Sequence, residues 1–231
     1  MFEITPAEWT AILLSLRVAV IATLVATPFG IALAWLLARY NFWGKSVLDA
    51  LIHLPLVLPP VVTGYLLLLA LGRRGLIGAW LADNLGIVFA FRWTGAALAC
   101  GVMSFPLLVR PIRLSIEAID RRLEQAASTL GAPPWKVFAS VTLPLALPGV
   151  LAGMVLGFAK AIGEFGATIT FVANIPGETQ TISSAIYSLI QTPEGDAAAA
   201  RLVLISIVIA MGALIASEWF ARRATKRLHG N

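Results

Sequence analysis

A long apolar stretch near the N-terminus decides the fold. Residues 11–38 read AILLSLRVAVIATLVATPFGIALAWLLA, and Arg17 is the one charged residue among them. About 20 mostly apolar residues in an α-helix cross the hydrocarbon core of a bilayer. The stretch therefore predicts a membrane-spanning helix, long enough to tilt or to project from the membrane.

Four further apolar runs follow along the chain, at residues 47–71, 94–109, 143–162 and 197–220. Whether the run at 143–162, the fourth in the chain, extends to residue 172 stays open. In lipid only helices and closed barrels satisfy the backbone, and these runs are too long and uniform for barrel strands. Of the 231 residues, 59% are hydrophobic and 13% are charged, whereas a soluble domain carries about 25% charged residues. The sequence predicts an all-α integral membrane protein with about five transmembrane helices.

Lysine and arginine indicate how the chain is oriented. With five spans, eleven cations fall on one side: Arg39, Lys45, Arg110, Arg113, Arg121, Arg122, Lys136, Arg222, Arg223, Lys226 and Arg227. Four fall on the other: Arg73, Arg74, Arg92 and Arg201. Because cytoplasmic loops carry the excess of cations, the N-terminus is predicted outside and the C-terminus in the cytoplasm. The start of the chain is acidic, so the first run is expected to be a retained helix and not a signal peptide.

Several function classes are excluded by the residues present. The net charge of +5 lies between apolar runs, so no nucleic-acid face is expected. Cys100 is the only cysteine and excludes an internal disulfide and a cysteine metal site. Gly44-Lys45-Ser46 resembles the end of a phosphate-binding P-loop, but Arg39 occupies the place of the required first glycine. The chain therefore has no ATPase motif, and we predict neither an enzyme nor a metal or cofactor site of its own.

The connection at residues 110–142 is predicted to be cytoplasmic and to hold an amphipathic helix. Apolar residues recur along it at helical spacing: Ile112, Ile116, Ile119, Leu123, Ala127 and Leu130. Ala132-Pro133-Pro134 is expected to end this helix. At about residues 76–90, on the opposite side, a short surface helix or a re-entrant segment stays open.

The same loop carries a spaced motif. Gln125-Ala126-Ala127 is followed after three residues by Gly131 and after nine more by Val141-Thr142-Leu143-Pro144. This resembles the signature of the permease subunits of binding-protein-dependent ABC importers, which is Glu-Ala-Ala, three residues, Gly, nine residues, Ile-x-Leu-Pro. Gln125 stands where the family has Glu, and Val141 where it has Ile.

The resemblance implies a type I ABC importer permease fold and a coupling loop, at about residues 113–142, that docks on a separate ATPase subunit. ATP and Mg²⁺ would bind to that subunit. The small residues of the motif would let the partner approach the helix backbone closely. The predicted coupling residues are Glu124, Gln125, Ala126, Ala127, Gly131, Leu143 and Pro144. The alternative is an ordinary amphipathic helix lying on the membrane.

Polar and helix-breaking residues inside the spans are candidates for the translocation path. Pro55, Pro59 and Pro60, together with Thr63 and Gly64, interrupt the second run, and such a break lines a cavity or is buried in protein. A broken helix can turn its N-terminal dipole toward an anion, although a kink for packing explains the prolines equally well.

Charged residues inside spans are functional candidates as well. Lys160 and Glu164 are four residues apart and share a helix face. An ion pair that holds the bundle is the favoured role, and a direct role in the path or gate is the alternative. Arg17 is expected to snorkel or to pair with another helix.

The cargo is suggested by resemblance alone. Three segments, at residues 54–66, 163–168 and 177–181, resemble the permeases of molybdate importers, and the resemblance runs over essentially the whole chain. It implies a permease in the bacterial inner membrane that moves molybdate or tungstate, with no cofactor of its own. Sulfate or thiosulfate permeases remain as an alternative. So does a non-transporting membrane assembly protein, whereas a gradient-driven transporter would need repeated halves that we do not find.

The chain is expected to be a single transmembrane permease domain over residues 1–231, with its core at about 10–221. It carries one copy of the coupling motif, whereas a complete importer of this type needs two. The resemblance therefore implies a homodimer with two ATPase subunits and a periplasmic molybdate-binding protein.

Overall fold

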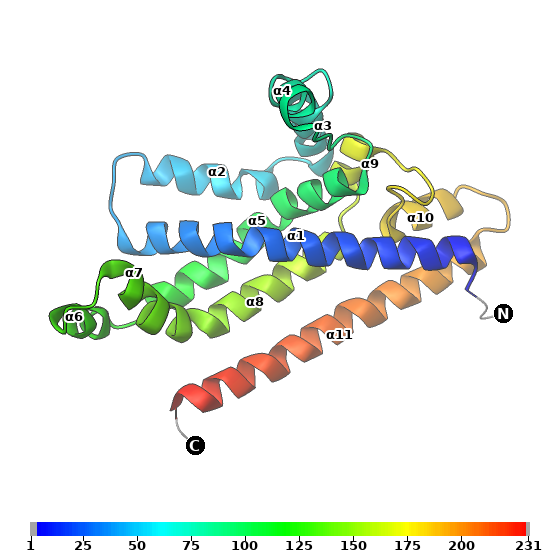
Figure 1. Ribbon diagram of the computed structural model, residues 1–231. Helices are drawn as coiled ribbons and strands as arrows, with labels where there is room; N and C mark the ends of the chain where they lie inside the picture. Colours follow the sequence, from blue (N-terminus) through cyan, green and yellow to red (C-terminus); the bar gives the residue numbers. More distant parts are fainter. Residues whose placement is uncertain (1–3, 230–231) are drawn as a thin grey trace.

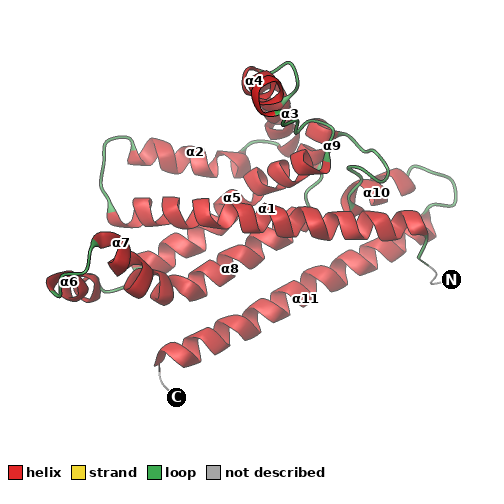
Figure 2. Ribbon diagram, in the orientation of Figure 1, coloured by secondary structure: helices red, strands yellow, loops and turns green. Residues whose placement is uncertain are grey.

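The computed structural model describes the backbone of residues 4–229 and the side chains of residues 4–216. Every regular element in this range is a helix, and the helices are joined by short loops (Figure 2). Among the described residues, four segments are long and apolar enough to cross a membrane: α1 (Pro6–Arg39), α5 (Trp93–Glu117), the stretch Pro134–Ile162 that ends in α8 (Leu143–Ile162), and residues Asp196–Ala216 of α11 (Asp196–His229). The all-α prediction is confirmed.

The second predicted span is not one straight helix. It consists of α2 (Lys45–Val57) and α3 (Pro60–Leu71), which meet at an angle of 116° and pass the spanning test only as a pair. The prediction of five spans holds when this pair is counted as one, and the predicted break in the second span is present at Pro59 and Pro60. Pro55 lies inside α2, and Thr63 and Gly64 lie inside α3, so these three residues do not interrupt a helix. Pro59 and Pro60 have no N–H to give to the carbonyls four residues earlier, so the helical ladder cannot continue through them.

Two other predicted boundaries also need correction. The fourth run does not extend to residue 172, because α8 ends at Ile162 and a separate helix, α9 (Gly166–Val172), follows it. The single amphipathic helix predicted in the loop at 110–142 is also wrong. Its first half continues α5, where Ile112 and Ile116 are buried, and its second half is α6 (Arg121–Thr129).

The remaining elements are short. They are α4 (Leu76–Leu85), α7 (Pro134–Val137), the π-helix η1 (Phe138–Thr142) and α10 (Ile182–Leu189). The sequence left open whether residues 76–90 form a short surface helix or a re-entrant segment, and α4 shows that this stretch contains a helix. The predicted break at Ala132-Pro133-Pro134 is confirmed, because α6 ends before it and α7 begins at Pro134.

The long helices α1, α5 and α8 run side by side as the centre of the bundle, and α11 lies along α8 (Figure 1). Close packing of α5 on α8 depends on small residues. A Cβ on Gly153 would stand 2.5 Å from the carbonyl oxygen of Leu108, and one on Gly149 would stand 2.7 Å from that of Pro111. Helices in lipid associate through such backbone approaches, because lipid gives no hydrophobic drive between them.

The ends of the bundle differ in charge. Figure 1 shows the α1–α2 connection, α6, α7 and the C-terminal end of α11 at one end of the molecule, and the N-terminus at the other. The first end therefore gathers the connections in which the sequence has its cation excess. The side chains of the tail cations Arg222, Arg223, Lys226 and Arg227 lie outside the described ones.

Candidate functional site

The coupling segment is a short exposed helix followed by a left-handed turn. Asp120 caps α6 by accepting a hydrogen bond from the N–H of Arg122, at 2.9 Å. Gly131 follows the helix with a φ of +85°, and a Cβ there would meet no other atom within 4 Å. That conformation favours glycine, and the open space above it leaves room for a second protein.

The outer surface of this segment exposes apolar and small side chains. Gln125, Ala126 and Gly131 are exposed, whereas Ala127 is half-buried. Leu130 is 89% exposed and Trp135 72% exposed. Both large apolar side chains lie on the outer surface of this polar loop, one on each side of Gly131. In the second half of the motif Leu143 is half-buried and Pro144 is exposed, both at the start of α8.

Glu124 differs from its neighbours because it points into the chain. Its Oε1 accepts hydrogen bonds from Arg39 Nε at 3.2 Å, from Arg39 Nη2 at 3.1 Å and from Thr142 Oγ1 at 2.6 Å. Arg39 Nη2 also lies 3.4 Å from the carbonyl oxygen of Ile119, just before α6. One carboxylate therefore connects the end of α1, the coupling helix and the π-helix that leads into α8.

A hollow of about 510 Å³ lies beside this carboxylate. Its walls come from the end of α1, from α6 and from η1, with Trp35 packed edge-on against Phe138 at a ring separation of 5.3 Å. The prolines of the motif explain the π-helix. Pro144 has no N–H for the carbonyl of Ser140, and the helix widens just before it so that the N–H of Leu143 reaches the carbonyl of Phe138.

At the other end of α8 the polar candidates of the sequence lie close together. Lys160 Nζ donates to Glu164 Oε2 at 2.7 Å, and Glu164 Oε1 accepts from the N–H of Ala167 at 3.0 Å. Glu164 is 1% exposed and the Lys160 side chain 30%. The carboxylate therefore has a counter-charge, and it also fixes the turn between α8 and α9.

Helix α9 packs against α3 where the second span is broken. A Cβ on Gly64 would stand 2.5 Å from the carbonyl oxygen of Ala167, and one on Gly166 would stand 2.7 Å from Pro60 Cβ. The structure thus brings together residues 59–64 and 163–168, two segments that the sequence analysis singled out separately. Thr63 is buried beside Gly64, and its hydroxyl has no partner among the described residues.

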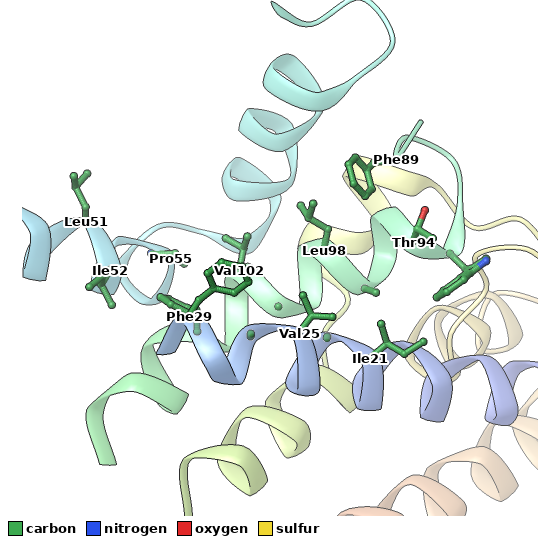
Figure 3. Close-up of a pocket in the computed structure, with 16 residues that line it drawn as sticks. Ile21, Val25, Phe29, Leu51, Ile52, Pro55, Phe89, Thr94, Leu98 and Val102 are labelled. Atoms are coloured by element: carbon green, nitrogen blue, oxygen red, sulfur yellow. The ribbon is translucent and has the colours of Figure 1, made fainter. Parts of the chain in front are cut away.

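A second hollow is apolar and lies between α1, α2 and α5. It has a volume of about 700 Å³, and Ile21, Val25, Phe29, Leu51 and Leu98 are among the residues that line it (Figure 3). A bare oxyanion in such surroundings would lose its hydration without gaining hydrogen-bond donors. This hollow is therefore no anion site, and the polar candidates at α3, α8 and α9 suit one better.

Sequence reasoning missed several of the contacts that hold these sites. Arg39 was counted only as a cytoplasmic cation, and Thr142 only as the variable position of the motif. Pairing with another helix was one of the two roles expected of Arg17. Its guanidinium carbon lies 3.7 Å from the centroid of the Trp93 ring on α5, so the pairing is present. In the described part of the chain no three His, Cys, Asp or Glu residues come together as metal ligands would.

Comparisons with known proteins agree with this geometry. Residues 26–226 match the family described as binding-protein-dependent transport system inner membrane component. The chain is 62% identical over 224 residues to the molybdenum transport system permease protein ModB of Escherichia coli (strain K12), covering 97% of this chain and 98% of that protein. It is 36% identical over 197 residues to the sulfate transport system permease protein CysT of the same organism, covering 85% and 70%.

A solved structure shares the fold. A bacterial ABC transporter involved in the import of the acidic polysaccharide alginate superposes with a TM-score of 0.75, at 20% identity, over 95% of this chain and 80% of that chain. At this identity the likeness shows the fold alone, which is that of an ABC importer permease.

Proposed function

The chain belongs to the family of binding-protein-dependent transport system inner membrane components, and on that premise we propose that it is the permease subunit of an ATP-driven importer of molybdate in the bacterial inner membrane. The choice of molybdate as the cargo rests on the 62% identity, over almost the full length, to a molybdenum transport permease. The sulfate permease is more distant, at 36%. Sulfate or thiosulfate transport remains the alternative, and tungstate is expected to share the path with molybdate.

The importer would contain two copies of this chain. Each copy offers one exposed coupling helix, α6, and a pair of ATPase subunits requires two such docking sites. The exposed Leu130 and Trp135 beside the open turn at Gly131 support docking over a helix that lies on the membrane. ATP and Mg²⁺ would bind to the ATPase subunits, and a periplasmic protein would deliver the anion.

A continuous series of contacts connects the coupling helix to the broken span. From α6 the chain passes through η1 into α8, and α8 ends beside Glu164, which holds the first turn of α9 through Ala167. Helix α9 in turn packs on α3 at Gly64. A tilt of α8 driven by ATP binding would therefore move the α3–α9 contact, as alternating access requires.

We propose that the anion path runs along the dimer interface, beside α3 and α9. The prolines at 59 and 60 leave the carbonyls of the last turn of α2 without their helical donors, and freed backbone groups in a membrane must line a cavity or be buried in protein. The first turn of α3 also presents its N-terminal dipole at this point, which favours an anion. Pro59, Pro60, Thr63 and Gly64 are the proposed path residues on α3.

Radiolabelled molybdate uptake in cells that lack this chain tests the proposal. We expect high-affinity uptake to be lost, to return when the chain is supplied, and to be blocked by unlabelled molybdate and tungstate but not by modest sulfate. Unchanged molybdate uptake together with lost sulfate uptake would overturn the choice of anion and leave the permease assignment in place. A chain that changes neither uptake would support an assembly protein.

A further inference from the structure

The chain holds α6 by an internal polar contact among Arg39, Glu124 and Thr142, of which only Thr142 belongs to the coupling motif, at its variable position. Glu124 precedes the motif and faces away from the exposed docking surface formed by Gln125, Ala126 and Leu130. Its side chain is 18% exposed and that of its partner Arg39 is 9% exposed. Thr142, the third member, is buried. These three residues are too enclosed to form part of an open docking surface.

Each of the three residues occupies the end of a different element. Arg39 is the last residue of α1, Glu124 lies in the first turn of α6, and Thr142 is the last residue of η1, directly before α8. Since Arg39 also reaches the carbonyl of Ile119, α1 holds both the start of α6 and the chain that enters it. While these hydrogen bonds are formed, a movement of α6 that displaces α8 must therefore displace α1 as well.

The π-helix is the point at which the backbone of this connection can change its geometry. The π-helix is rare, and it occurs mostly as a single turn inside an α-helix, frequently at functional sites. Here Thr142 is the last residue of the π-helix, and its hydroxyl donates to Glu124 at 2.6 Å, the shortest of the three side-chain contacts. The joint thus meets α8 where its backbone is most readily adjusted.

We infer that Arg39, Glu124 and Thr142 form a joint that passes the movement of the coupling helix to α1 and α8 together. This inference rests on the proposed function, because a joint has a role only if an ATPase moves α6. The three act as positioning residues, since they touch neither cargo nor nucleotide. The joint moves two long helices as one body, so ATP hydrolysis without it would tilt α8 incompletely.

The test is the amount of molybdate transported per ATP hydrolysed. It uses the assembled complex of permease and ATPase in proteoliposomes, with the molybdate-loaded binding protein on the outer side. Thr142→Val keeps the shape of the side chain and removes only the hydroxyl, whereas Thr142→Ser keeps the hydroxyl. Glu124→Gln removes the charge and keeps the acceptor oxygen.

Loss of a hydrogen bond to a charged group shifts a two-state equilibrium by roughly tenfold. We therefore expect Thr142→Val and Glu124→Gln to lower the ratio of molybdate to ATP by at least about threefold, while phosphate release and the amount of complex change little. Thr142→Ser should restore the ratio.

Arg113 provides the matched control. It joins α5 to α2 at the same end of the bundle, through Asp49 at 2.9 Å, and also pairs with Glu117 at 2.8 Å. Among the described side chains it forms no hydrogen bond or ion pair with α6 or η1. Arg113→Met should lower the amount of complex without changing the ratio.

Two results would overturn the joint. One is a normal transport ratio in both Thr142→Val and Glu124→Gln. The other is loss of the complex in Thr142→Val with recovery in Thr142→Ser, which would show that the hydroxyl only holds the fold. If the wild-type proteoliposomes show no ATP-dependent molybdate uptake, the proposed function is wrong. That result is distinct from failure of the joint, which requires normal uptake by the wild type.

Discussion

Gly64 of α3 lies against the backbone of Ala167 in α9, so that a Cβ on Gly64 would stand 2.5 Å from the carbonyl oxygen and 2.9 Å from the Cα of Ala167. No flexible side-chain end could move aside there, because both atoms belong to a helix backbone. The contact holds the two halves of the proposed path together. It also explains why a glycine follows Thr63 in a helix that otherwise consists of large apolar residues.

Gly64→Ala tests this contact. The added methyl group would force α3 away from α9, and overpacking of this kind costs about 1–3 kcal/mol of the free energy of unfolding. We expect a lower melting temperature of the purified subunit and a loss of uptake.

Gly101→Ala on α5 is the control for Gly64→Ala, because its Cβ would meet only Ala22, at 3.8 Å or more. It should leave uptake unchanged and gain up to about 1 kcal/mol from helix propensity. Equal behaviour of the two variants would contradict the close contact of α3 with α9.

Gly131→Trp should uncouple ATP hydrolysis from uptake. A Cβ on Gly131 would meet no other atom of this chain within 4 Å, so a side chain begins there in open space on the proposed docking surface. The left-handed backbone adds a strain of about 1–2 kcal/mol for any L-residue, and Gly131→Ala measures that part alone. We expect uptake per ATP hydrolysed to fall several-fold in the Trp variant and little in the Ala variant. Both variants should still insert into the membrane.

Gly86→Trp is a second control for the Gly131 variants. Gly86 has the same left-handed conformation and open surroundings, but it ends α4 away from the coupling loop. Normal uptake in Gly131→Trp, or an equal loss in Gly86→Trp, would contradict docking at the turn.

Lys160 and Glu164 allow their two proposed roles to be separated. Lys160→Met leaves the buried carboxylate of Glu164 without its cation, which should cost about 3 kcal/mol or more in the free energy of unfolding. Lys160→Met combined with Glu164→Gln removes both charges, while the amide oxygen can still accept from the N–H of Ala167. We expect the double variant to recover most of the stability.

Uptake by that double variant decides between the roles. If the pair only holds the bundle, uptake should recover together with the melting temperature. A stable double variant without transport would instead assign the pair a direct role in the anion path or gate, and would show that holding the bundle is not its only role.

Glu8 and Arg201 should be coupled in stability. Glu8 Oε1 accepts from Arg201 Nη2 at 2.8 Å, and Glu8 Oε2 accepts from the N–H of Thr5 at 2.7 Å, so one carboxylate joins α1 to α11 and caps α1. A double-mutant cycle of Glu8→Gln and Arg201→Gln should give an interaction energy of about 0.5–3 kcal/mol. Strictly additive melting-temperature shifts would show that the pair contributes nothing to holding α11.

Much of the fold could be predicted because lipid imposes strong local rules. Apolar runs reveal spans without any knowledge of neighbours, and the prolines at 59 and 60 reveal a break because they lack the N–H that a helix requires. The coupling motif could be located because its spacing is a property of the chain alone. These features depend on residues next to one another in sequence.

Helical periodicity was misleading where one helix follows another. Ile112 to Leu130 keep one helical spacing, yet Ala118 and Ile119 lie between α5 and α6, and the pattern continues across the interruption. A short break removes no apolar residue from the series, so spacing alone cannot show where the span ends and the coupling helix begins.

The sequence by itself determined that this chain is a helical membrane protein, which segments cross the membrane, and where the coupling loop lies, since hydropathy and motif spacing are local quantities. Only the tertiary structure decided the 116° bend of α3 on α2, the meeting of Gly64 with Ala167, and the joint of Arg39, Glu124 and Thr142. Arg39 and Glu124 are 85 residues apart in sequence. A local pattern shows that a charge or a glycine is present, but its partner depends on how distant helices pack together.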